Sequence, residues 1–229
     1  MPALLKYNPD HHRETQEYLY LLISLVMLIL IPPIASYFQA QEISVDILFS
    51  LVTVLGIYVT TDTAAQLKIG ISLGALALLF RWLCIFLPQP GWFLVLGQVI
   101  FAFVFLIYIS FHLAKSIINS RNTTISTIYG AIAGFLLLGL ISAQIFMMLE
   151  LFIPGSLVFN EGKSAIDYIY FSYVILTGIG FGDIVPVEAV AKSFSVLIGI
   201  SGQIYLTVLI AILIGKFLSE SNKLPHESD

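Results

Sequence analysis

Three glycines alternate with larger apolar residues over positions 178–182, a spacing that could bind a cation. The order is Gly-Ile-Gly-Phe-Gly, followed by Asp183. Glycine adopts backbone conformations that other residues avoid. Because glycine alternates with Ile179 and Phe181, one face of an extended strand can expose bare carbonyl oxygens while the other face packs. Rings of such oxygens can replace the hydration shell of a cation. We call residues 178–183 the filter strand.

The apolar segment 164–177 precedes the filter strand and would position it. As a helix it rises only about 20 Å, which is too short to span a bilayer, so we expect a re-entrant helix. Its negative C-terminal end would favour a cation in front of it.

Composition places the chain in a membrane. Of its 229 residues, 59% are hydrophobic and 10% are charged, whereas a soluble domain carries about 25% charged residues. The single cysteine, Cys84, excludes an internal disulfide framework and is expected to be a small core residue. The first apolar run lacks a small-residue cleavage site, so we expect a retained helix.

The hydropathy pattern predicts an all-α membrane protein with six transmembrane helices, a re-entrant helix and an extended filter. Each span needs about 20 mainly apolar residues. The predicted spans are 18–38, kinked near Pro32 and Pro33, 43–61, 68–87, 92–115, 124–153 and 188–218. The expected organisation is an N-terminal cytoplasmic segment (1–17), a four-helix transmembrane domain (18–118), a pore domain (119–218) and a cytoplasmic tail (219–229).

The distribution of Lys and Arg predicts that both termini are cytoplasmic, in a plasma or inner membrane. This orientation puts the filter strand near the outer face. The inner residues are Lys6, Arg13, Lys68, Lys115, Arg121, Lys216 and Lys223, and the outer ones are Arg81, Lys163 and Lys192.

Residues 129–217 resemble the two-helix pore unit of potassium channels. The resemblance rests on Leu176-Thr177, on Ile179-Gly180-Phe181-Gly182-Asp183 and on Gly202-Gln203-Ile204-Tyr205-Leu206, in the family's order between two spans. It implies K⁺ binding by the filter residues, a homotetramer around one central pore, and surrounding membrane lipid. No cofactor other than the permeant K⁺ and no nucleic-acid partner is expected. The residues implied in K⁺ binding are Gly178, Ile179, Gly180, Phe181 and Gly182.

The resemblance also implies residues that support the filter. Asp183 is tied in the family to a donor in the pore helix, so we predict a hydrogen bond from Tyr170; the alternative is that Tyr170 belongs to the interfacial aromatic belt. Thr177 matches the family's Thr before the filter. Gly178 departs from the family, which usually has Thr there, and its missing hydroxyl predicts a weaker or more hydrated innermost ion site.

Gating is expected to differ from that of voltage-gated channels, although the six-helix layout is similar. No charged residue lies in the fourth predicted span from Trp92 to Ile109. Voltage sensing needs several charges, since each supplies about 2.3 kcal/mol per 100 mV.

Gly199 and Gly202 interrupt the last span, and Gly202 matches the family's hinge position; plain helix packing is the alternative.

Two further features concern charges inside spans and small residues. Asp46 and Arg81 could lie at one depth and form an ion pair, or each could reach the headgroups independently. Glu150 is expected to be interfacial, or to brace the filter from behind. Gly70/Gly74 and Gly130/Gly134 have the spacing of close helix contacts, although glycine is also common in membrane helices.

Together these features predict a potassium-selective channel that is not steeply voltage-gated. The alternatives are a weakly selective cation channel or a silent, regulatory subunit. A secondary transporter is less favoured, because it predicts a second broken segment. No catalytic motif is present, so an enzyme is not expected.

Overall fold

The computed structural model describes residues 9–60, 63–119, 125–159 and 163–221. Within them, six helices are long and apolar enough to cross a membrane. Lys6, Arg121, Lys223 and residues 222–229 of the expected tail lie outside the described ranges. The long helices are α1 (Pro9–Ala35), α2 (Gln41–Val59), α3 (Ala64–Phe86), α4 (Trp92–Asn119), α5 (Ile125–Phe152) and α7 (Ala189–Ser221).

The six predicted spans are confirmed, with differences at their ends. α1 begins at Pro9, well before the predicted residue 18, and continues through Pro32 and Pro33 to Ala35. A 3-10 turn, η1 (Ser36–Phe38), follows. Helix ends depend on local hydrogen bonding that hydropathy does not report.

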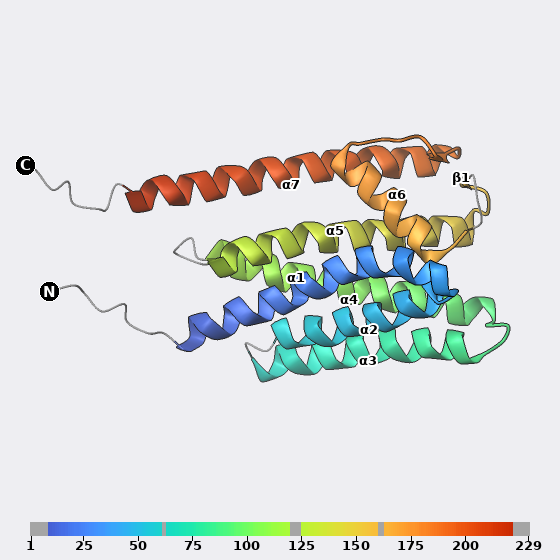
Figure 1. The fold of residues 1–229 in the computed structure, drawn as a ribbon, viewed down its shortest axis with the longest axis horizontal. Helices are drawn as coiled ribbons and strands as arrows, with labels where there is room; N and C mark the ends of the chain where they lie inside the picture. Colours follow the sequence, from blue (N-terminus) through green and yellow to red (C-terminus); the bar gives the residue numbers. More distant parts are fainter. Residues whose placement is uncertain (1–8, 61–62, 120–124, 160–162, 222–229) are drawn as a thin grey trace, which may run out of the picture.

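The helices form layers in which α5 separates α7 from the four N-terminal helices (Figure 1). α5 contacts α1, α4, α6 and α7. Small buried residues along it, among them Ala131, Ala133, Gly139 and Ala143, let neighbouring backbones approach closely.

The start of α1 and the end of α7 lie at one end of the bundle, as an even number of spans requires (Figure 1). The opposite end carries two short strands, β1 (Leu157–Phe159) and β2 (Ile184–Pro186), and we call it the strand end. The strands pair antiparallel, with Val158 opposite Val185. The sequence did not predict this pairing.

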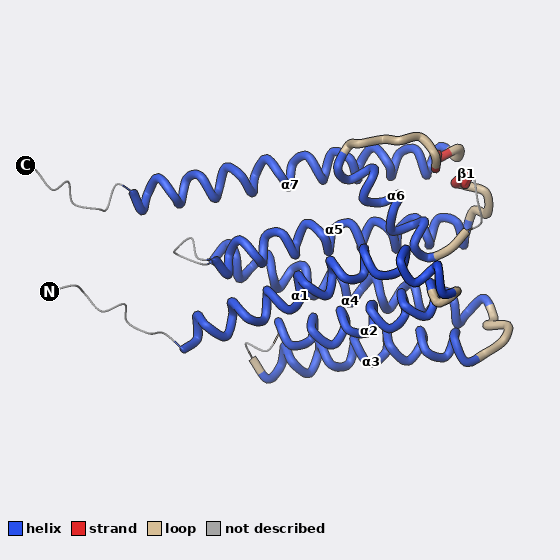
Figure 2. The backbone as a smooth tube through the Cα atoms, viewed as in Figure 1, coloured by secondary structure: helices blue, strands red, loops and turns tan. Residues whose placement is uncertain are grey.

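The predicted re-entrant helix is α6 (Ala165–Thr177), a short apolar helix between α5 and α7. The backbone N–H of Ser164 donates to the Asp167 carboxylate at 2.8 Å and caps its first turn. After α6 the chain turns back beside α7 and reaches β2 at the strand end, as the loop in Figure 2 shows. α6 and the filter strand therefore form one re-entrant hairpin.

Candidate functional site

The filter strand alternates between two backbone conformations. Gly178, Gly180 and Gly182 have φ angles of 76°, 64° and 79°, whereas Ile179 and Phe181 keep negative φ. Only glycine adopts positive φ without a steric penalty. Alternating the two conformations rotates successive peptide planes, so consecutive carbonyls can face one side. The spacing of the glycines is therefore explained by the positive φ angles that the backbone adopts at these three positions.

Gly178 has a further role that explains why threonine is absent there. It ends α6 in the left-handed conformation, with its N–H donating to the Ile175 carbonyl at 3.0 Å. The next N–H, from Ile179, reaches the Val174 carbonyl at 3.1 Å. Glycine is the usual residue at such a helix end, because a Cβ is strained there. The departure from the family therefore coincides with a helix cap.

The predicted hydrogen bond between Tyr170 and Asp183 is confirmed. The Tyr170 hydroxyl donates to Oδ2 of Asp183 at 2.6 Å, and the N–H of Ile184 donates to Oδ1 at 3.1 Å. The bond from Tyr170 is the main cause that lowers the pKa of Asp183 below its usual value. The Tyr170 ring also stacks on Phe181, with centroids 6.4 Å apart and planes within 3°. One residue of α6 therefore contacts two residues of the filter strand, Phe181 and Asp183.

Side chains of α6 pack against α5 where α5 carries a small residue, Gly139. The Tyr173 ring lies against Gly139, where a side chain would overlap it, and the Tyr173 hydroxyl donates to the Leu136 carbonyl at 2.6 Å. The buried Ser172 hydroxyl donates to the Gly139 carbonyl at 2.8 Å. These contacts fix the direction of α6.

α7 approaches the end of α6 most closely at Gly202. A Cβ on Gly202 would collide with the carbonyl oxygen of Leu176 and lie 2.9 Å from the carbonyl carbon. At Gly199 the nearest such atom is the Ile175 carbonyl oxygen, at an ordinary 3.5 Å. Gly202 is thus a close-packing position. The hinge role expected for Gly199 and Gly202 stays a prediction.

Gln203 supports the inner end of the filter strand, a role that the sequence did not predict. Its side-chain amide donates to the Thr177 carbonyl at 3.4 Å. The same amide nitrogen lies 3.3 Å from the position that a Cβ of Gly178 would occupy. Thr177, which was expected to support the filter, donates its hydroxyl back to the Tyr173 carbonyl at 2.7 Å. The Gln203 side chain therefore occupies the space beside Gly178.

Glu150 organises the turn before β1, and its contacts among the described residues do not include the filter strand. Its carboxylate accepts from the Gly155 N–H at 2.8 Å, the Ser156 hydroxyl at 2.9 Å and the Leu157 N–H at 3.2 Å. It also pairs with Lys163. Since β1 pairs with β2, Glu150 restrains the chain that leaves the filter. The Pro-Gly turn at 154–155 was the available sequence signal.

The predicted ion pair in the four-helix domain is also confirmed. Arg81 Nη2 lies 2.7 Å from Asp46 Oδ1. The guanidinium also lies over the Phe49 ring, 4.3 Å from its centroid. Both glycine pairs lie at contacts, for instance Gly74 against Ile57 and Gly134 against Tyr205.

Comparison with known proteins adds one finding. Residues 134–219 match the family model described as "Ion channel". They cover most of α5, all of α6 and the filter strand, and nearly all of α7, which is the expected pore unit. The match supports an ion channel and points away from an enzyme. No curated protein and no solved structure matches the chain significantly.

Proposed function

We propose that the chain forms a potassium-selective channel that conducts K⁺ passively through the centre of a homotetramer. The observation that carries the proposal is the alternation of positive-φ glycines along the filter strand. Carbonyls of residues 178–181 then bind the dehydrated ion, as carbonyl rings do in such filters. Asp183 and Tyr170 hold the strand from outside, through the 2.6 Å hydrogen bond between them.

The exposed face of α7 supports assembly of several copies. Val196, Leu197 and Ile200 each expose more than half of their surface, and α7 has the smallest buried share of the six spans, 17%. An apolar face of this size next to the filter strand is suited to contact neighbouring copies and lipid. One chain supplies one filter strand, and a ring requires several.

The distribution of charged residues supports two further parts of the proposal, the gating behaviour and the orientation in the membrane. α4 carries no charged residue from Trp92 to Ile109, so steep voltage gating is not expected. The excess of Lys and Arg on one side supports a cytoplasmic position for both termini. Residues 18–118 form the four-helix domain and 119–218 the pore domain.

The decisive test is the reversal potential of single channels in planar bilayers with mixed K⁺ and Na⁺. A potential close to the K⁺ equilibrium value is expected; equal permeability would overturn potassium selectivity and leave the weakly selective alternative.

Gly180→Ala should abolish conduction, since a Cβ at φ 64° costs about 1–2 kcal/mol in each copy. Gly215→Ala is the control, because the space around Gly215 is open. A silent subunit would give no current with either the native chain or the control.

A further inference from the structure

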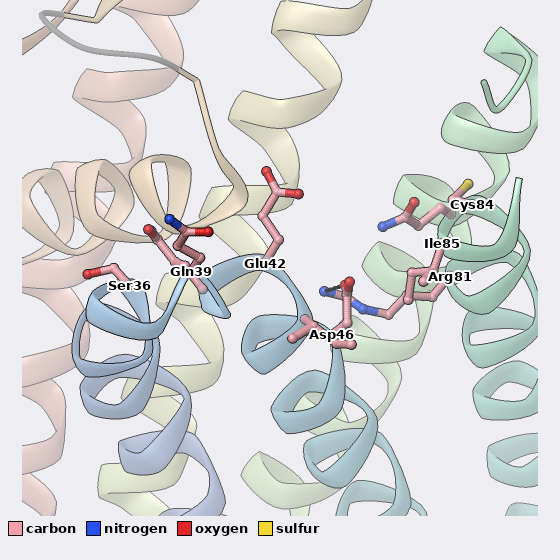
Figure 3. A pocket seen from close by; sticks show the side chains of 10 residues that line it. Ser36, Gln39, Glu42, Asp46, Arg81, Cys84 and Ile85 are labelled. Atoms are coloured by element: carbon pink, nitrogen blue, oxygen red, sulfur yellow. Dashed lines mark ion pairs between the residues drawn. The ribbon is translucent and has the colours of Figure 1, made fainter. Parts of the chain in front are cut away.

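A polar pocket opens at the strand end of the four-helix domain, far along the chain from the filter strand. Its volume is about 730 Å³, within the range of small-molecule sites. It is bounded by η1, the first turns of α2, the end of α3 and one residue of α4 (Figure 3). The lining residues that matter here are Glu42, Ile43, Asp46, Arg81, Cys84 and Ile85.

A buried cation forms one wall of this pocket. Only 5% of the Arg81 surface is exposed. Its guanidinium pairs with Asp46 at 2.7 Å and lies over the Phe49 ring. A guanidinium has five N–H donors. Within the described residues, Arg81 Nε has no hydrogen-bond acceptor. Burial of a donor without an acceptor is unfavourable, so Arg81, which lines the pocket, has capacity for an additional anionic oxygen.

The exposed carboxylate of Glu42 is a second charged group that lines the pocket. Glu42 lies one helical turn before Asp46 on α2, so both side chains share one face. In Figure 3 the Glu42 carboxylate points away from the Asp46–Arg81 pair. Asp46 and Arg81 compensate each other's charge, and Glu42 leaves one negative charge for a cationic group.

The position of the pocket indicates where its ligand comes from. Asp46 lies five residues into α2, about 7 Å along the helix from its first residue, so the pocket lies near the strand end of this span. Two apolar lining residues, Ile43 and Ile85, are exposed, and the neighbouring Phe86 is 75% exposed. They offer an apolar path for acyl chains beside the polar pocket.

We propose that this pocket binds the headgroup of a zwitterionic phospholipid of the phosphatidylethanolamine class. The phosphate lies toward Arg81, the ammonium toward Glu42, and the acyl chains run along Ile43, Ile85 and Phe86. The inference does not depend on which ion the chain conducts. A free zwitterion such as phosphoethanolamine shares the headgroup chemistry, and the apolar rim favours the lipid.

Cys84 allows a direct test, because it lines the pocket and is the single cysteine of the sequence. The native protein is placed in nanodiscs of phosphatidylglycerol, with or without phosphatidylethanolamine, and labelled with a water-soluble maleimide. Phosphatidylethanolamine should slow labelling by about threefold or more, since an occupied pocket excludes the reagent. Equal labelling rates in the two membranes would overturn the proposal.

Two variants separate the site from general effects of the membrane. Glu42→Gln removes the partner of the ammonium and should abolish the difference between the membranes, whereas Glu188→Gln, outside the pocket, should preserve it. Protection that persists in Glu42→Gln would contradict the assigned orientation. Equal protection by free phosphoethanolamine in phosphatidylglycerol nanodiscs would overturn the lipid assignment. Because Glu42 is exposed in the first turn of α2, its substitution should not prevent folding.

Discussion

The Tyr170 hydroxyl lies 2.6 Å from Oδ2 of Asp183, so α6 is bonded to the residue that leaves the filter strand. The same tyrosine stacks on Phe181 inside the strand. Two adjacent parts of the strand therefore depend on one side chain of α6.

Tyr170→Phe should separate these two roles, because the ring remains and the donor is lost. We expect inactivation about two to three times faster, a modest effect because solvent weakens an exposed pair of this kind. The measurement is the decay of macroscopic K⁺ current. Asp183→Asn should give a similar change, and the double variant little more, because the substitutions act on one interaction. Unchanged inactivation in Tyr170→Phe would remove this support from the filter.

The pH dependence of the filter should follow the protonation of Asp183. Its pKa is lowered, chiefly by the hydrogen bond from Tyr170. The carboxylate therefore stabilises the folded site fully above the ordinary aspartate pKa, and this contribution is lost as pH falls through the lowered value. Current should be steady from neutral pH to about pH 4 and decline below it. Asp183→Asn should show no such acid step in an external pH titration.

Glu150→Gln should destabilise the strand end. The Glu150 side chain is only 9% exposed, and its carboxylate accepts from two backbone N–H groups and the Ser156 hydroxyl. An amide loses the charge-assisted strength of these bonds, at a cost of about 1–3 kcal/mol. Thermal unfolding in detergent should reveal it, together with faster inactivation, because β1 pairs with β2. Glu188→Gln is the control for loss of charge, and an equal effect there would argue against the turn.

Gly202→Ala should destabilise the contact between α6 and α7. The added Cβ meets the backbone carbonyl of Leu176, which cannot move without displacing the start of the filter strand, so a cost of about 1–3 kcal/mol per copy is expected. Gly199→Ala should be milder, because its nearest contact is 3.5 Å away. Gly215→Ala should stabilise slightly, since alanine favours helix by about 1 kcal/mol. Normal stability of Gly202→Ala, with altered opening, would favour a hinge instead.

Gly178→Thr should not produce a stronger inner site, although potassium channels usually have threonine at the corresponding position. Threonine at φ 76° is strained by about 1–2 kcal/mol in each copy, and its Cβ would lie 3.3 Å from the Gln203 amide. We expect reduced current and lower thermal stability. Combining it with Gln203→Ala should recover part of the loss, because space is released. An increase in K⁺ selectivity in the single variant would contradict this account.

Local sequence features determined much of the architecture. Six spans and the re-entrant helix follow from hydropathy and length, because a membrane requires every backbone polar group to be satisfied within helices. The glycines at 178, 180 and 182 specified the backbone of the filter strand, since their spacing acts within the strand itself. The Asp46–Arg81 contact was predictable because the two charges were expected at one depth. The Tyr170–Asp183 contact was predictable from the resemblance to potassium channels.

Tertiary structure decided the contacts that join separate elements. Hydropathy did not reveal that Glu150 holds the turn before β1, that β1 pairs with β2, or that Gln203 fills the space beside Gly178. It also left open whether Gly202 is a packing position, and the approach of the Leu176 carbonyl made it one. Such contacts depend on how closely two distant backbones approach, which the order of residues along either segment does not specify.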